Sequence, residues 1–469
     1  MSGVVIRSNV PIEIQAFAAW AEDYLSGKAV AAPRGAALAW QRREALRTLI
    51  ETEPERALAF AVPYRWRTQL PFEVTRHFES QVDGRGDLAI ALGENSSGRP
   101  TVYAQATIGR TNYRAYVYGR RVAQPCLTNV PLHGILLDGK LALSHDPMRV
   151  LSADESHALH DFSNATANHA CRVCAKESAA VASAIVADLG GESAVFCGQD
   201  HYRMVHDYWI ASEAELARRK LAGGTSGNSW THGEKSLLYI RVNFPDDLTE
   251  PISAESANAN LAQVNAFYVK NSYNATSLRW TVTPLLTLPY PKAWYGTNNG
   301  DVFALLTNAR EAAKAAGYDT ANYDLDIVCL PSVPTYSWGG LGMVGGKGTW
   351  LQSTGVSVTA HELGHNFGLL HANFWNPLTN TISTGFGTNV EYGNTFDVMG
   401  GSSRGDFSAM FKNSLTWLPD ASAQRITTSG VHRAMSPNGC PRHWVWPMCC
   451  SSCAAAAGGG WPAAQARCC

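Results

Sequence analysis

The chain has 469 residues and a formal net charge of −1, with 45% hydrophobic and 16% charged residues, so we expect a globular protein of two or three domains. Its basic residues are dispersed rather than clustered, which argues against a nucleic-acid partner. No apolar run approaches the roughly 18 to 20 residues that span a bilayer, so we expect no transmembrane segment.

Residues 1–150 are predicted to form a small α+β domain without evident catalytic residues. Apolar residues recur with helical spacing at Trp40, Leu46, Leu49 and Ile50, which predicts one buried helix face. Alternating strand-like segments follow, with turn residues between them. These segments are Asp87 to Leu92, Thr101 to Ile108, Tyr113 to Tyr118 and Gly134 to Leu143.

Residues 151–222 contain a candidate structural metal site. Cys171 and Cys174 form a Cys-x-x-Cys pair, and Cys197 with His201 forms a Cys-x-x-x-His pair. Four such ligands can close a tetrahedral zinc site. The alternatives are that the cysteines form a disulfide or remain plain thiols, or that another nearby histidine is the fourth ligand.

Residues 223–433 show the order strand, helix, strand, helix, strand, which is compatible with a mixed sheet covered by helices. Asp301 is the predicted N-cap of the second helix, and Gly317 is its predicted end. The predicted elements are a strand over 236–242, a helix whose apolar face carries Leu261, Val264, Phe267 and Tyr268, a strand over 278–283, a helix over 302–316 and a strand over 326–330.

A glycine-rich run lies between this last strand and the next helical segment. Backbone with few side chains is expected where another chain approaches closely, and an edge strand can bind an extended peptide by adding it to the sheet. We therefore take Gly340, Leu341, Gly342 and Met343 as the candidate edge for an extended polypeptide. A flexible glycine-rich loop is the alternative.

The most informative stretch contains His361, Glu362, His365, Gly368 and His371. Residues four apart share one face of a helix, so His361 and His365 can both aim a ring nitrogen at one ion. Gly368 can take the positive φ that ends the helix, which lets His371 reach the ion as third ligand. Three nitrogens leave the fourth tetrahedral position to water, as in a catalytic zinc site, with Glu362 beside it as a general base.

A turn-rich segment after the third histidine, Glu391 to Gly400, delivers Met399. The histidine motif and this methionine together resemble the metzincin clan of zinc metallopeptidases. Within that clan, His-Glu-Leu-Gly-His-Asn-Phe-Gly-Leu-Leu-His followed by Phe-Asp-Val-Met-Gly is most similar to the gametolysin-type peptidases, family M11. The continuation from Asp406 to Asn413 adds to this resemblance, which covers roughly residues 225 to 430.

The resemblance implies an α+β protein with a metzincin-like catalytic domain, in which a mixed twisted sheet with covering helices carries the zinc helix and a Met-turn. It implies a zinc-dependent metalloendopeptidase with protein or peptide substrates, in which Zn²⁺ on the three histidines activates a water and Glu362 takes its proton. Met399 would lie beneath the imidazoles as an apolar support. The alternative class is a catalytically impaired module that binds zinc or protein.

The position of residues 1–150 before the catalytic domain makes them a candidate pro-domain. Some metzincin pro-segments block the zinc with a cysteine thiolate, and Cys126 is the only cysteine of this region that could do so. A buried or free thiol is the alternative for this residue.

Residues 434–469 depart from the family pattern, because the sequence there becomes rich in alanine, glycine and cysteine and loses all periodicity. Either the reading frame slips near residue 434 or the tail is a genuine extension.

The sequence does not decide the cellular compartment of the protein. The resemblance implies secretion, but the N-terminus shows no recognisable signal peptide, so a cytoplasmic location is an alternative. Oligomeric state is not predicted.

Overall fold

The computed structural model divides into two compact units, Met1–Ile90 with Tyr103–Ala217 and Ala91–Val102 with Arg218–Cys469. We describe each unit by itself. The structure describes residues 10–28, 31–94, 100–144, 149–150, 185–188, 193–196, 229–297, 301–376, 387–401, 405–419, 422, 425–426 and 466–467.

The first unit combines a group of helices with a small sheet. Its described helices are α1 (Ile12–Leu25), α2 (Ala32–Thr52), α3 (Pro54–Ala59), α4 (Tyr64–Gln69), α5 (Phe72–Thr75) and the 3-10 helix η2 (Gly119–Ala123). Its strands are β1 (Ser80–Glu94), β2 (Pro100–Ile108), β3 (Thr111–Tyr116), β4 (Leu127–Leu137), β5 (Lys140–Leu143), β6 (Arg149–Val150), β7 (Ile185–Asp188) and β8 (Ser193–Phe196). The end of β1 from Ala91 and the start of β2 up to Val102 belong to the second unit. The first five strands follow the order β1-β2-β3-β5-β4, and β4 also pairs with β1, so they close on themselves.

Two sequence predictions in this unit need correction. The predicted helix face is wrong at Trp40, which is 53% exposed; the buried face instead includes Arg42, whose guanidinium pairs with the buried Glu79 at 2.8 Å. The predicted strand from Gly134 to Leu143 is two strands, β4 and β5. Asp138 and Gly139 separate them with φ angles of 50° and 76°, as a tight hairpin requires.

The second unit contains a mixed sheet with helices on both faces. Its elements are β9 (Gly233–Asn243), α8 (Ala254–Asn271), β10 (Thr276–Thr287), η4 (Lys292–Gly296), α9 (Val302–Ala315), η5 (Thr320–Asn322), β11 (Leu325–Cys329), β12 (Gly340–Met343), β13 (Thr349–Leu351), α10 (Val356–Asn366), β14 (Phe374–Asn376), β15 (Thr388–Val390), α11 (Ala409–Ser414), β16 (Arg425–Ile426) and β17 (Ala466–Arg467). The strands β10, β9, β11 and β13 are parallel in that order. β12 then runs antiparallel to β13, so the predicted mixed sheet is confirmed.

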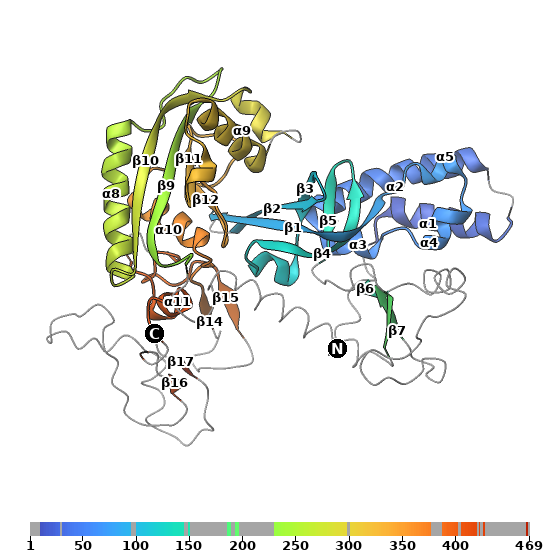
Figure 1. Cartoon of the computed structure of the whole chain (residues 1–469). Helices are drawn as coiled ribbons and strands as arrows, with labels where there is room; N and C mark the ends of the chain where they lie inside the picture. Colours follow the sequence, from blue (N-terminus) through green and yellow to red (C-terminus); the bar gives the residue numbers. More distant parts are fainter. Residues whose placement is uncertain are drawn as a thin grey trace. The chain divides into compact units, whose positions relative to one another are not determined.

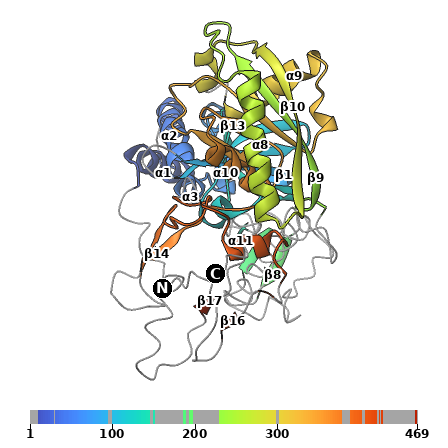
Figure 2. The ribbon, with the colours of Figure 1, turned by 90° about the vertical axis from the view of Figure 1, so that its left-hand side faces the viewer.

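The two faces of this sheet can be followed from neighbouring residues of β13. Successive side chains of a strand point to opposite faces. The hydroxyl of Thr349 donates to Asn366 of α10, whereas the indole of Trp350 donates to the carbonyl of Val302 at the start of α9. α8 shares one buried core with α10. Thus α8 and α10 cover one face and α9 the other (Figures 1 and 2).

The predicted helix signals in this unit are confirmed. Asp301 caps α9, because its carboxylate accepts hydrogen bonds from the N–H groups of Phe303 and Ala304 at 3.0 and 2.9 Å. Gly317 follows the helix with φ 94°, a conformation that glycine adopts without steric cost. No helix in the described parts of the chain has the length and apolar character to cross a membrane.

Candidate metal centre

The helix that carries the histidine motif ends as the sequence predicts. Gly368 has φ 104°. Its N–H donates to the carbonyl of His365 at 2.8 Å, and the N–H of Leu369 donates to the carbonyl of Gly364 at 3.0 Å. This pair of bonds is the Schellman arrangement that closes a helix C-terminus. The chain then reverses direction, which brings His371 beside the helix.

A separate oxygen accepts a hydrogen bond from Nδ1 of each motif histidine. For His361 this acceptor is the carbonyl of Val398 at 2.8 Å, and for His365 it is the carbonyl of Leu369 at 2.7 Å. For His371 it is the carboxylate of Glu391 at 2.6 Å. Carbonyl and carboxylate oxygens can only accept, so each Nδ1 carries the proton. Each Nε2 is therefore left with its lone pair, the form that binds a metal.

The three rings converge on a common point. Their candidate ligand atoms lie within 4.8 Å of one another, and no other group in the described part of the chain meets this condition. The Nε2 atoms of His365 and His371 are 3.1 Å apart, close to the roughly 3.3 Å that two nitrogens span on a tetrahedral zinc. The Nε2 of His361 is buried with no hydrogen-bond partner among the described residues. These residues fit a zinc ion.

The surroundings keep all three rings neutral. Burial lowers the pKa of His361 to about 4, although its bond to Val398 opposes the shift. Burial and the neighbouring rings hold the pKa of His365 well below its ordinary value. The pKa of His371 falls to about 2, through burial and then through His361. Because a ligating imidazole must be deprotonated, the site is ready for a metal at neutral pH.

Glu362 belongs to α10, the helix of the histidine motif, and its side chain is almost fully buried where α10 packs on β12. A Cβ atom at Gly340 would lie 2.7 Å from Cγ of Glu362, and one at Gly342 would lie 2.5 Å from the Glu362 carbonyl oxygen. Real Cβ atoms do not approach so closely, so these two positions need glycine. The glycine-rich strand therefore lets the helix and its carboxylate pack directly on the backbone of β12.

Met399 is fully buried and contacts the same helix at Gly364, away from the contacts of Glu362 with β12. A Cβ at Gly364 would lie 2.5 Å from its sulfur, which places the thioether against the helix between the two ligand positions. The turn before it is fixed by Asp397, whose carboxylate accepts from the N–H groups of Met399 and Ser408, both at 2.8 Å. The same turn supplies Val398, the acceptor for His361.

The structure confirms a strand with the bounds Gly340–Met343 at the predicted polypeptide edge, but both of its sides are paired. One side pairs with β13. On the other side, Met343 pairs with Ala91 and Gly342 with Leu92 in antiparallel register. Ala91 and Leu92 belong to the same compact unit as the site. In the full chain, its own segment therefore occupies the edge predicted for an extended polypeptide.

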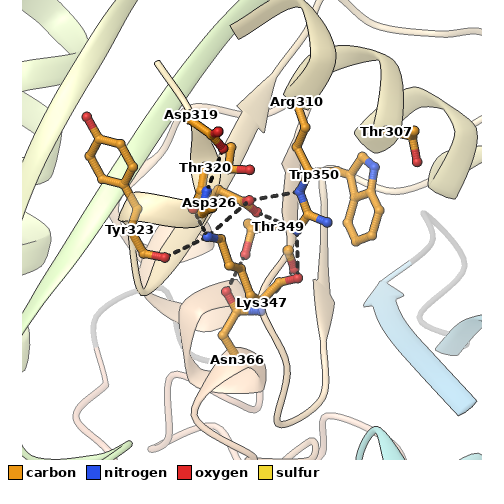
Figure 3. A network of polar contacts seen from close by, with 12 residues as sticks. Thr307, Arg310, Asp319, Thr320, Tyr323, Asp326, Lys347, Thr349, Trp350 and Asn366 are labelled. Carbon is orange, nitrogen blue, oxygen red and sulfur yellow. Dashed lines mark hydrogen bonds and ion pairs between the residues drawn. The ribbon is translucent and has the colours of Figure 1, made fainter. Parts of the chain in front are cut away.

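A polar network holds the β12–β13 hairpin against the rest of the unit (Figure 3). Asn366, which follows His365 in the zinc helix, donates to the carbonyls of Met343 and Gly348 at 3.1 and 3.0 Å. On the opposite face, Arg310 of α9 donates to the buried Asp326 at 2.8 and 3.0 Å and to the carbonyl of Lys347 at 2.9 Å. The strand beside Glu362 is thus anchored from both faces of the sheet.

Two site residues were not assigned a role from the sequence. Glu391 orients His371, and the hydroxyl of Tyr392 lies 2.8 Å from the His371 Nε2. Both stand in the turn-rich segment that delivers Met399. Their only sequence signal is this position between the third histidine and the methionine. Nothing in the spacing indicates which of these side chains turns toward the three histidines.

The sequence also predicted cysteines as possible metal ligands, and only one of these, Cys126, lies among the described residues. Cys171, Cys174, Cys197 and His201 lie outside the described residues, so the second zinc site stays a prediction. Cys126 contacts the backbone of Ile90, whose N–H lies 3.3 Å from its sulfur. Burial raises the pKa of this thiol to about 11, opposite to the shift that favours a thiolate ligand. Cys126 is a free, partly buried cysteine in the structure, which favours the alternative of a thiol without a ligand role.

Three converging neutral imidazoles beside a buried carboxylate define the class of a metallohydrolase site. Residues 245–454 match the sequence model of the gametolysin peptidase M11 family, which confirms the resemblance seen in the sequence. This match includes every motif residue and, with the three-histidine cluster, supports a metallopeptidase.

Among solved structures, the chain is similar to the crystal structure of metalloproteinase-II from Bacteroides fragilis. The identity is 10%, the alignment covers 70% of this chain and 90% of that one, and the TM-score is 0.27. A score this low carries no argument about either unit. The search of curated proteins gave no match.

Proposed function

We propose that the protein is a zinc-dependent endopeptidase that hydrolyses peptide bonds of protein substrates. The observation that carries this proposal is the convergence of three Nε2 atoms, each with its Nδ1 already committed to an oxygen. A structural zinc site is closed by four protein ligands, whereas the described residues supply three here. That count favours a site with a position left for water or substrate.

His361, His365 and His371 would hold the zinc, which supplies Lewis acidity to the substrate carbonyl and lowers the pKa of a water. Glu362 is next to a ligand in sequence and buried against β12. In our proposal its carboxylate accepts the proton of the attacking water and then passes it to the leaving amine. Glu391 keeps the His371 ring in place through its hydrogen bond to Nδ1.

The arrangement beneath the rings supports a metzincin-type centre. Met399 packs against Gly364 of the zinc helix, and its turn carries the carbonyl that orients His361. We assign the segment from Asp397 to Gly400 as the Met-turn. Its role in this proposal is mechanical, because a buried apolar side chain excludes water from below the rings without competing for the metal.

The test of this function is a chelator-controlled digestion of casein by the full chain. We expect hydrolysis that 1,10-phenanthroline abolishes and that added zinc restores. The matched control is 1,7-phenanthroline, which has the same shape but cannot chelate, and which should leave the activity unchanged. If casein is not cleaved, or if both isomers act alike, the alternative of a catalytically impaired zinc- or protein-binding module is favoured instead.

We propose that residues 1–150 act as a pro-domain, because Ala91 and Leu92, which precede the catalytic domain in the sequence, pair with the proposed substrate edge. The side of β12 that an extended peptide would use is paired with Ala91 and Leu92. Strand addition to such an edge is a common way to bind a peptide. We propose that substrate binds antiparallel to Gly340–Met343 after this segment has left, so that the full chain is partly latent.

Replacing Gly93 with Val tests this latency. A Cβ at Gly93 would lie 2.6 Å from the carbonyl oxygen of Gly340, so the end of β1 has to move away from β12. We expect the peptidase activity of the full chain to rise several-fold, measured as the initial rate on a fluorogenic peptide.

The matched control for this experiment is Gly86→Val in the same strand. There the added Cβ meets the carbonyl of Thr107 in β2 rather than β12, so β1 is disturbed without freeing the substrate edge. We expect no gain in rate from this variant. Equal rates for the two variants, or a Gly93→Val rate at or below that of the unaltered chain, would contradict the assignment of β1 as the occupant of the edge.

From the family resemblance, we also propose that the enzyme is exported. A second zinc on Cys171, Cys174, Cys197 and His201 remains a proposal from spacing alone.

A further inference from the structure

The side chain of Tyr392 enters the metal centre. Its hydroxyl lies 2.8 Å from the Nε2 of His371, which is the nitrogen that faces the proposed ion. The phenol ring lies 4.0 Å from the His371 ring, centroid to centroid, and 6.0 Å from the His361 ring. Tyr392 is almost fully buried. The phenolic oxygen is therefore beside the point on which the three imidazoles converge.

The backbone at Tyr392 is held in a conformation that a tyrosine rarely adopts. Its φ is 56°, in the left-handed region that bulky side chains avoid. The N–H of Tyr392 donates to the side-chain oxygen of Asn373 at 3.0 Å, and Asn373 in turn donates to Glu391 at 2.8 Å. The residue that orients His371 is thus tied to the one that fixes Tyr392. Strain of this kind, maintained by surrounding bonds, is typical of functional positions.

A phenol in this place can do chemistry that none of the three imidazoles can. Once the Nε2 of His371 is committed to a metal, it no longer accepts a hydrogen bond, and the Tyr392 O–H can turn to another acceptor. The oxygen of a scissile carbonyl held beside the three histidines would be such an acceptor, and it would gain negative charge when water attacks. A preorganised donor at that oxygen stabilises the transition state more than the bound substrate.

We propose that Tyr392 is a catalytic residue that donates its phenolic hydrogen bond to the carbonyl oxygen of the peptide bond under attack. This inference rests on the proposed peptidase function. It gives Tyr392 a role separate from that of Glu362 in the same reaction. The carboxylate of Glu362 handles the proton of the water, while the O–H of Tyr392 stabilises the oxygen that becomes negative. The phenol keeps its proton throughout.

The test is Tyr392→Phe in the full chain, which removes one oxygen and retains the ring packing on His371. We expect kcat to fall by about 10²- to 10³-fold, with KM changed by less than about threefold and zinc content unchanged by elemental analysis. Binding of a phosphinic peptide, which mimics the tetrahedral transition state, should weaken by a similar factor in calorimetry. An unchanged kcat, or a loss explained by lower zinc content, would overturn the assignment.

Two further variants separate catalysis from structure. Tyr295→Phe is the matched control, because it removes another buried hydroxyl of this unit, one that accepts from Asn308 at 3.0 Å; its kcat should be unchanged. Asn tolerates a positive φ, so Tyr392→Asn should lose kcat like the Phe variant without added backbone strain. If Tyr392→Asn keeps full kcat, the inference fails.

The outcomes also distinguish this inference from the proposed function. If the unaltered chain cleaves peptides in a zinc-dependent manner and Tyr392→Phe does so equally well, only the role of Tyr392 is wrong. If the unaltered chain binds neither zinc nor the phosphinic peptide, the proposed function fails and the role of Tyr392 fails with it.

Discussion

Replacing Glu362 with Gln is expected to lower kcat by about 10²- to 10⁴-fold, the contribution typical of a general base, while zinc stays bound. Gln has the same shape, so the close packing against Gly340 is preserved. Its amide, however, cannot accept the proton of a water. The measurement is kcat on a fluorogenic peptide together with zinc per chain by elemental analysis. Normal turnover by this variant would refute the role of Glu362 as base.

Glu391→Gln is the matched control for this experiment. It changes another carboxylate of the same centre, one that accepts from Nδ1 of His371 rather than packing beside the proposed water. Changes at such orienting residues typically weaken metal affinity by 10- to 100-fold. We therefore expect Glu391→Gln to need more zinc for full activity but to keep most of its kcat when saturated. If both variants behave alike, the division of labour between the two carboxylates is wrong.

Replacing His365 with Ala is expected to empty the metal site and abolish activity. His365 is fully buried, and its Nε2 lies 3.1 Å from the Nε2 of His371. Without it, the two remaining imidazoles are too few to hold zinc tightly. We expect zinc to fall from about one equivalent to near zero, relative to any zinc elsewhere in the chain. Zinc should also no longer raise the melting temperature through this site, because stabilisation requires binding to the folded state.

His232→Ala serves as the control for that loss. His232 lies in the same unit but outside the three-histidine cluster, and it contacts the hydroxyl of Thr231. Its replacement should leave zinc content and the zinc-dependent melting temperature unchanged. A His365→Ala protein that retained full zinc and activity would show that the three rings do not share one ion.

Local signals were sufficient for several structural features that depend on a few consecutive residues. The helical spacing of His361 and His365, the turn at Gly368 and the cap at Asp301 were all predicted, and the structure confirms them. Each follows from backbone geometry within a single turn of helix. Residues Gly340–Met343 were taken as a candidate strand edge with a flexible loop as the alternative, and the structure shows them as the strand β12. The local sequence could not decide between the two, because glycine permits many backbone conformations.

Features that depend on distant partners could not be predicted in this way. Trp40 was placed on the buried face of its helix because apolar spacing was the only guide, whereas a buried ion pair between Arg42 and Glu79 decides which side faces inward. The turn between β4 and β5 was also not predicted, and a single strand was expected there instead. Its signal is local, because Asp138 and Gly139 form the turn with positive φ angles. In the first case the deciding partner lies 37 residues away in the chain.

The sequence by itself determined the three histidines of the proposed metal site and the adjacent carboxylate, because their spacing and one helix turn bring them together. Only the tertiary structure decided how the site is completed. The acceptor for His361 comes from the Met399 turn, the Tyr392 hydroxyl comes from a strained backbone position, and the pairing of β12 with Ala91 joins segments about 250 residues apart. Contacts of this range depend on how whole elements pack, and no local pattern of residues encodes them.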